Sequence, residues 1–142
     1  MGAILRTATI ASSANRTADY PGIDVYPSWS PNGSQIAFWS DRDASGHFVM
    51  PALGGLPRKV ISTTTQFPRL PQWSANGEEL SGLVAVSREG FIEIVSLRTR
   101  ESRRLALPEV GFDLSWSRDG RFFAYFVWQE DVGDIWVMDV VE

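Results

Sequence analysis

Tyr26-Pro27-Ser28-Trp29-Ser30-Pro31-Asn32-Gly33 is the first of three closely similar stretches in this chain of 142 residues. The second runs over residues 71–77 (PQWSANG) and the third over residues 114–120 (LSWSRDG). Their tryptophans and glycines recur at intervals of 44 and 43 residues. A fixed period in this range indicates one supersecondary unit per repeat. The structural repeat is therefore marked by Trp29, Gly33, Trp73, Gly77, Trp116 and Gly120.

The residues after each tryptophan predict short antiparallel strands. Each copy ends in Asn-Gly or Asp-Gly, the strongest short-range hairpin signal. Apolar runs that are too short and too aromatic or β-branched for helices follow. The second strand of each unit is expected over residues 36–39, 80–86 and 122–128, and the third over 47–50, 91–97 and 134–141. A fourth is expected at 58–61 and 103–107.

Four antiparallel strands in about 43 residues are the size of a β-propeller blade. The nearly continuous apolar runs favour this architecture, because both faces of a blade are covered by its neighbours. The recurring tryptophan is expected to fill the space between blades. An ordinary β-sandwich with regularly spaced turns is the alternative, but a sandwich does not require a tryptophan in register with each turn.

The stretch YPSWSPNGSQIAFWSDRD, followed by VMPALGGLPRKV, resembles the TolB-type WD-like β-propeller repeat. The resemblance covers residues 20–142 and is weaker in the second copy, where Ser81 and Gly82 stand at positions that usually carry larger residues. It implies a six-bladed ring. It also implies that protein–protein interaction is the typical use of the fold.

The chain contains fewer blades than a closed ring needs, since propellers have about four to eight. We divide it into an orphan outer strand (5–10), blade 1 (20–62), blade 2 (66–107) and blade 3 (110–142), which lacks its outer strand. A single copy would expose the outer faces of blades 1 and 3 and a bare strand edge. We therefore expect half of a six-bladed ring, a homodimer in which residues 5–10 of each copy complete blade 3 of the other. A fragment of a longer propeller is the alternative.

Composition narrows the possible functions. The chain is 44% hydrophobic and 21% charged, as in folded proteins, and its net charge of −4 argues against nucleic-acid or anionic-membrane binding. It has no cysteine, which leaves no disulfide or thiolate chemistry. Residues 1–14 lack the positively charged start of a signal peptide. A cytoplasmic location is expected from this, or a periplasmic one if the N-terminus is not the native one.

In a propeller, the loops between strands 2 and 3 meet at one mouth of the ring, where binding residues gather on a rigid scaffold. The candidate binding residues there are Trp39, Asp41, Arg42, Asp43, Arg88, Glu89, Trp128, Glu130 and Asp131. The alternative is that these charges are only solvated hairpin ends.

Catalytic and metal chemistry have weaker support. Asp41 with Asp43, or Glu130 and Asp131 with Asp134, could offer oxygen ligands, but no EF-hand spacing is present. His47 is the only histidine, and no G-x-S-x-G motif accompanies it, so it is expected to be a polar residue at a strand start. We expect no catalytic residue, metal or cofactor. The arginines at 98, 100, 103 and 104 are interrupted by Glu101 and are expected to form a solvated edge.

These observations predict an all-β protein of four-stranded antiparallel propeller blades, three in the chain. Its expected function is that of a non-catalytic binding scaffold for a protein or peptide at the loop-lined mouth. An enzyme or carbohydrate-binding protein with its site in the central channel is the first alternative. A fragment with no independent activity is the second. Fold analogy alone does not decide between them.

Overall fold

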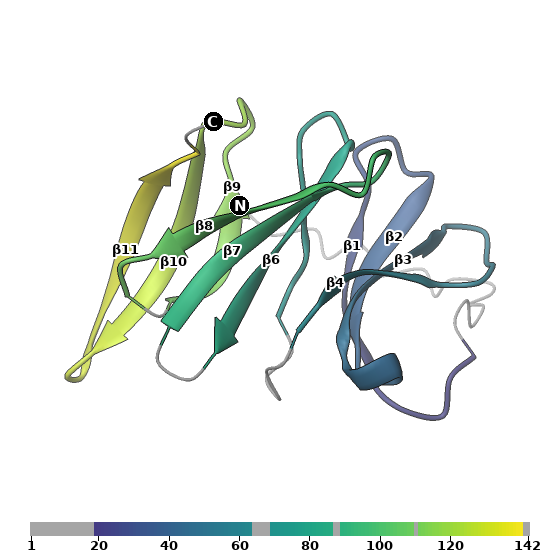
Figure 1. The fold of residues 1–142 in the computed structure, drawn as a ribbon, viewed down its shortest axis with the longest axis horizontal. Helices are drawn as coiled ribbons and strands as arrows, with labels where there is room; N and C mark the ends of the chain where they lie inside the picture. Colours follow the sequence, from purple (N-terminus) through teal and green to yellow (C-terminus); the bar gives the residue numbers. More distant parts are fainter. Residues whose placement is uncertain (1–18, 64–68, 87–88, 110, 141–142) are drawn as a thin grey trace, which may run out of the picture.

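A computed structural model describes residues 19–63, 69–86, 89–109 and 111–140 (Figure 1). Three antiparallel sheets follow one another along the chain and lie side by side (Figure 1). Sheet 1 contains β1 (Asp24–Trp29), β2 (Gln35–Ser40), β3 (Gly46–Pro51) and β4 (Arg58–Ser62). Sheet 2 contains β5 (Gln72–Trp73), β6 (Glu79–Val86), β7 (Glu89–Ser96) and β8 (Ser102–Leu107). Sheet 3 contains β9 (Gly111–Trp116), β10 (Phe122–Gln129) and β11 (Val132–Asp139).

The strands of each sheet are ordered as they occur in the chain, β1-β2-β3-β4, β5-β6-β7-β8 and β9-β10-β11. The all-β fold class is thus confirmed. Within the described residues, helical structure is limited to one 3₁₀ turn, η1 (Arg42–Ala44). No helix of the described chain is long and apolar enough to cross a membrane. The expected orphan strand at residues 5–10 lies outside the described residues.

The repeated Trp-Ser-x-Asn/Asp-Gly motif forms the same turn in every sheet. In sheet 1 the hydroxyl of Ser30 donates to Oδ1 of Asn32 at 2.9 Å and accepts from the backbone N–H of Gln35 at 2.9 Å. Sheets 2 and 3 repeat both bonds, with Ser74 and Ser117 as the serines. The glycine that ends each motif has φ between 71° and 75°, a conformation that glycine adopts without strain. These bonds explain why serine, Asn or Asp, and glycine recur together.

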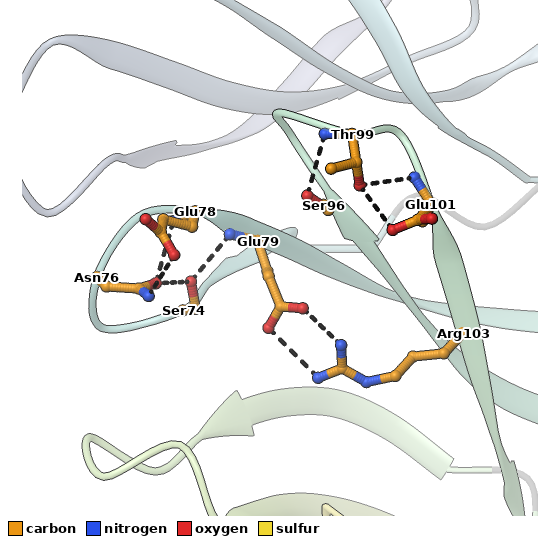
Figure 2. A network of polar contacts seen from close by, with 8 residues as sticks. All are labelled: Ser74, Asn76, Glu78, Glu79, Ser96, Thr99, Glu101 and Arg103. Carbon is orange, nitrogen blue, oxygen red and sulfur yellow. Dashed lines mark hydrogen bonds and ion pairs between the residues drawn. The ribbon is translucent and has the colours of Figure 1, made fainter. Parts of the chain in front are cut away.

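Figure 2 shows this turn in sheet 2 with the neighbouring β7–β8 turn. Arg103 joins the two, because its guanidinium pairs with the carboxylate of Glu79 at 2.5 Å. Ser96 accepts from the backbone N–H of Thr99 at 3.2 Å, and the Thr99 hydroxyl donates to Glu101 at 3.1 Å. Local polar contacts at this end of sheet 2 therefore add to the apolar packing of Trp73, Leu80 and Leu97.

Two of the three repeat tryptophans, Trp73 and Trp116, lie between sheets as the sequence predicts, whereas Trp29 is 62% exposed. Trp73 is 9% exposed and packs with Ala37 and Val49 of sheet 1, and its indole N–H donates to the carbonyl of Ser28 at 3.0 Å. Trp116 packs against the core between sheets 2 and 3. That core contains buried side chains from both sheets, namely Leu83, Ile92, Ile94, Leu107, Leu114, Phe123, Tyr125 and Val127.

His47 links sheet 1 to sheet 2. Its side chain is fully buried, and its Nε2–H donates to the carbonyl of Arg69 at 3.0 Å, which leaves Nδ1 as the unprotonated nitrogen. A Cβ atom at Gly82 of β6 would lie 2.4 Å from the imidazole Cε1. The glycine that seemed small for its strand position is therefore the residue that admits the histidine ring. His47 does lie at the start of β3, as predicted.

We expect Gly82→Ala to lower the free energy of unfolding by about 1–3 kcal/mol, because the buried imidazole has no free space to move into. In a His47→Ala background the same change should cost much less, since the ring that meets the new methyl group is gone. Denaturant unfolding of the four proteins gives the coupling between the two positions. Equal costs of Gly82→Ala in both backgrounds would contradict this packing.

Candidate functional site

The expected binding loops lie at one end of the sheets. The β2–β3 connection, which contains η1, and the β10–β11 turn both lie at the lower end in Figure 1. β6 also ends and β7 begins at this end of the sheets, but Arg88 lies outside the described residues. Of the other candidate residues, some are buried and others are exposed to solvent.

Arg42 is held inside sheet 1. Its guanidinium forms two bonds to the carboxylate of Asp24, at 2.6 and 2.8 Å, and its Nε donates to the hydroxyl of Ser40 at 2.9 Å. The ring of Tyr20 lies 4.3 Å from the guanidinium carbon. Arg42 is only 14% exposed. Its charge is therefore neutralised within the chain, and it offers little surface to a ligand.

The neighbours of Arg42 strengthen this arrangement. Asp41 accepts the backbone N–H of Ile23 at 2.9 Å. Desolvation and the Asp41 carboxylate raise the pKa of the Tyr20 phenol, so that Tyr20 is neutral where it stacks on Arg42. The sequence places the connection that contains Tyr20 and ends at Asp24 at the same mouth, but neither residue is among the candidate binding residues, because neither belongs to the repeated motif. The pairing of β1 with β2, which sets Asp24 opposite Ser40, brings Asp24 close to Arg42.

Trp39 lies in the core, although the sequence placed it at the mouth. It is 4% exposed, and its indole N–H donates to the hydroxyl of Thr63 at 3.3 Å. This corrects the expectation that Trp39 contributes to the binding surface. In a strand covered on both faces, the apolar pattern does not distinguish a core tryptophan from one at the strand end.

The candidates that the structure does expose are acidic or aromatic. Asp43, Glu89, Glu130 and Asp131 are exposed, and the Lys59 ammonium donates to the backbone carbonyl of Asp43. Trp128 is 57% exposed at the end of β10, with its ring centroid 5.8 Å from that of Phe126. Because Arg42 is neutralised by Asp24, the exposed candidate residues at this end carry negative charge.

The β10–β11 turn is the best-defined part of this end. Glu130 and Asp131 have φ of 45° and 65°, which suits a two-residue hairpin turn between paired Gln129 and Val132. A hollow of about 590 Å³ beside the turn is lined by Gln129, Glu130, Val132 and Asp134. The hollow offers the carboxylates of Glu130 and Asp134, whereas Trp128, one residue along β10 from the paired position of Asp134, points to the other face of the hairpin.

Catalytic chemistry finds little support among these groups. Burial lowers the pKa of His47 to about 4, and the ring contacts Arg69 and Gly82 rather than a solvent-facing site. It therefore cannot serve as an accessible general base. No group of three or more His, Asp or Glu side chains in the described part of the chain is arranged to hold a metal ion.

Comparison with solved structures decides the fold. A TolB-type protein from Agrobacterium tumefaciens superposes with a TM-score of 0.66 at 22% identity, over 79% of this chain and 41% of that chain. TolB from Acinetobacter baumannii also gives a TM-score of 0.66, at 16% identity over 84% of this chain and 30% of that one. This chain has a TolB-like β-propeller fold. Each of its sheets corresponds to a blade, so it contains part of a TolB-like ring.

A sequence relative is also known among curated proteins. The uncharacterized peptidase YuxL of Bacillus subtilis is 36% identical over 97 residues, which are 67% of this chain and 14% of that protein. No family model matches the sequence. The TolB-like chain thus spans about one seventh of the curated relative and less than half of the solved structures.

Proposed function

We propose that this chain is a non-catalytic binding scaffold that recognises a protein or peptide at the acidic end of its blades. The observation that carries the proposal is the exposure of Trp128 on the same hairpin whose turn carries the exposed carboxylates of Glu130 and Asp131. Aromatic side chains are enriched at protein interfaces, and the rims of these interfaces are polar. The partner that fits is a segment with lysine or arginine beside an apolar residue.

The test selects peptides from a random phage-displayed library against the full chain. We expect enrichment of sequences that combine basic and apolar residues. Trp128→Ala, or Glu130→Gln with Asp131→Asn, should weaken binding of a selected synthetic peptide at least about tenfold. Glu78→Gln, an exposed acidic residue of the β5–β6 turn, is the matched control and should leave binding unchanged. Selection of acidic peptides, or binding that is unaffected at Trp128, would contradict the proposal.

The name of the curated relative gives the second candidate, an enzymatic role connected with peptide hydrolysis. His47, the single histidine, is buried in the contact between sheets 1 and 2. A histidine-dependent peptidase site would therefore need its histidine from outside this sequence. Release of fluorescent product from labelled casein by the 142-residue chain would favour the enzyme, and its absence together with peptide binding would favour the scaffold.

We further propose that two copies form the complete propeller, with residues 5–10 of each pairing with β11 of the other. What supports this is the strand count: β11 of sheet 3 takes the place of β3 and β7, which each pair with a fourth strand. Ile135 and Val137 of β11 are exposed, as expected for an outer blade face that has no neighbouring blade against it. Deletion of residues 1–12 should lower the melting temperature and the mass in solution if the strand is exchanged.

A further inference from the structure

The contact of Trp73 with sheet 1 shows one way in which a repeat tryptophan binds to the neighbouring blade; the buried indole N–H of Trp116 has no such partner. Its indole N–H donates to the carbonyl of Ser28, and its ring packs with Ala37 and Val49. Ser28 is paired with Ala37 across β1 and β2, and Ala37 with Val49 across β2 and β3. These three residues therefore form one receiving surface.

Sheet 3 carries the same receiving surface on its outer face. Ser115 precedes the repeat tryptophan of β9 as Ser28 does in β1, and it pairs with Ala124. Ala124 in turn pairs with Val137. Both sheets also contain a residue with positive φ two positions before the serine, Tyr26 at 57° and Asp113 at 46°, beside a shift in strand register. The match therefore includes the local backbone.

This outer surface of sheet 3 is open. Val137 is 67% exposed and Ile135 is 71% exposed, whereas Val49, which occupies the position of Val137 in sheet 1, is buried. A hollow of about 360 Å³ lies here and is lined mainly by apolar atoms from Asp113, Ser115, Ala124, Tyr125, Phe126 and Ile135. Ser115 and Ala124, two of the three residues that would receive a tryptophan, thus line a depression on this face.

The chain also carries the complementary group on its opposite flank. Trp29 occupies in sheet 1 the position of Trp73 in sheet 2, yet it is 62% exposed. Other apolar residues on that face of sheet 1 are covered: Phe38 and Phe48 are buried, and the Arg42 guanidinium carbon lies 5.5 Å from each ring centroid. Trp29 is therefore the most exposed aromatic side chain of sheet 1.

We propose that the hollow on sheet 3 binds Trp29 of a second copy of this chain, with the indole N–H donating to the Ser115 carbonyl. The inference deepens the two-chain assembly proposed above by naming the contact that joins the copies. Since each copy has one Trp29 and one hollow, two reciprocal contacts close a twofold-symmetric ring. The contact between sheet 3 of one copy and sheet 1 of the other would thus have the same form as the contact between sheets 2 and 1 within one chain.

Sedimentation equilibrium of the full chain, over a range of concentrations, tests this interface. The wild type should form a dimer. Trp29→Ala and Val137→Glu should each weaken association at least about tenfold, because each alters both contacts of the ring. Leu53→Ala, an exposed apolar residue in the β3–β4 connection, is the matched control and should have no effect. Far-ultraviolet circular dichroism checks that all variants keep their sheets.

A mixture of the two variants gives the sharpest result. In a mixed pair, both substitutions fall in one contact, and the other contact joins an intact Trp29 to an intact hollow. The mixture should therefore associate more strongly than either variant alone. A monomeric wild type, open higher oligomers, an unaffected Trp29→Ala, or no gain on mixing would each overturn the interface. Peptide binding at Trp128 is measured separately, so loss of one activity without the other shows which proposal has failed.

Discussion

Trp73→Ala should lower the free energy of unfolding by about 3–5 kcal/mol, the usual cost of removing a large buried aromatic side chain. Trp73 is 9% exposed and contacts Ala37 and Val49 across the boundary between two sheets. The substitution leaves a cavity there and also leaves the Ser28 carbonyl without its 3.0 Å partner. Both effects act against the folded state. Equilibrium denaturation in urea measures the loss.

Trp29→Ala is the control for this experiment, because Trp29 has the same place in its repeat but is mostly exposed. At protein concentrations too low for association, its loss should cost less than about 1 kcal/mol. The difference between the two losses of unfolding free energy gives the effect of burying the tryptophan, because any effect of the motif itself is common to both positions. A cost below about 1 kcal/mol at Trp73 would mean that the contact between sheets 1 and 2 contributes little.

Acidification should destabilise the fold through His47. Burial lowers the pKa of its imidazole to about 4, although the bond to the Arg69 carbonyl acts in the opposite direction. In the unfolded chain the same group titrates near its ordinary value of 6.5. Between these values the unfolded state binds a proton that the folded state does not. The contribution to stability is therefore constant above about pH 6.5 and decreases as the pH falls toward 4, by about 3 kcal/mol in total.

Carboxylates titrate in part of the same interval, so the measurement must isolate the histidine. The free energy of unfolding is compared between the wild type and His47→Gln at several pH values from 7 to 4. Glutamine can still donate to the Arg69 carbonyl but carries no titrating group. The two curves should be parallel above about pH 6.5 and converge, or cross, below it. Curves that stay parallel throughout would show that His47 is not held neutral.

The fold could be predicted from the sequence because its repeated turn needs particular residues. Ser30, Asn32 and Gly33 each satisfy a local requirement of hydrogen bonding or backbone conformation. Such requirements can be recognised from the residue types in the sequence. The apolar runs between the turns then had to be strands. The candidate site was harder to predict, since the exposure of a side chain depends on contacts with residues that are distant in the sequence. Arg42 is withdrawn from solvent by Asp24, 18 residues earlier, and nothing in the motif indicates that pair.

His47 illustrates the same limit. Its place at the start of β3 followed from the pattern, but its burial depends on the absence of a side chain at Gly82 in the next sheet. A small residue at an otherwise large position was the available signal. The sequence shows a small residue at position 82, but it does not show that the imidazole of His47 occupies the space beside it.

The link from His47 to the Arg69 carbonyl has a further consequence for how the molecule opens. Arg69 precedes β5, so the histidine of sheet 1 holds the segment through which the chain enters sheet 2. In repeat proteins stability is transmitted through neighbouring units. Amide protons of β3 and β6 should therefore exchange with solvent in a single cooperative event. Those of β11, at the free edge, should exchange first and independently.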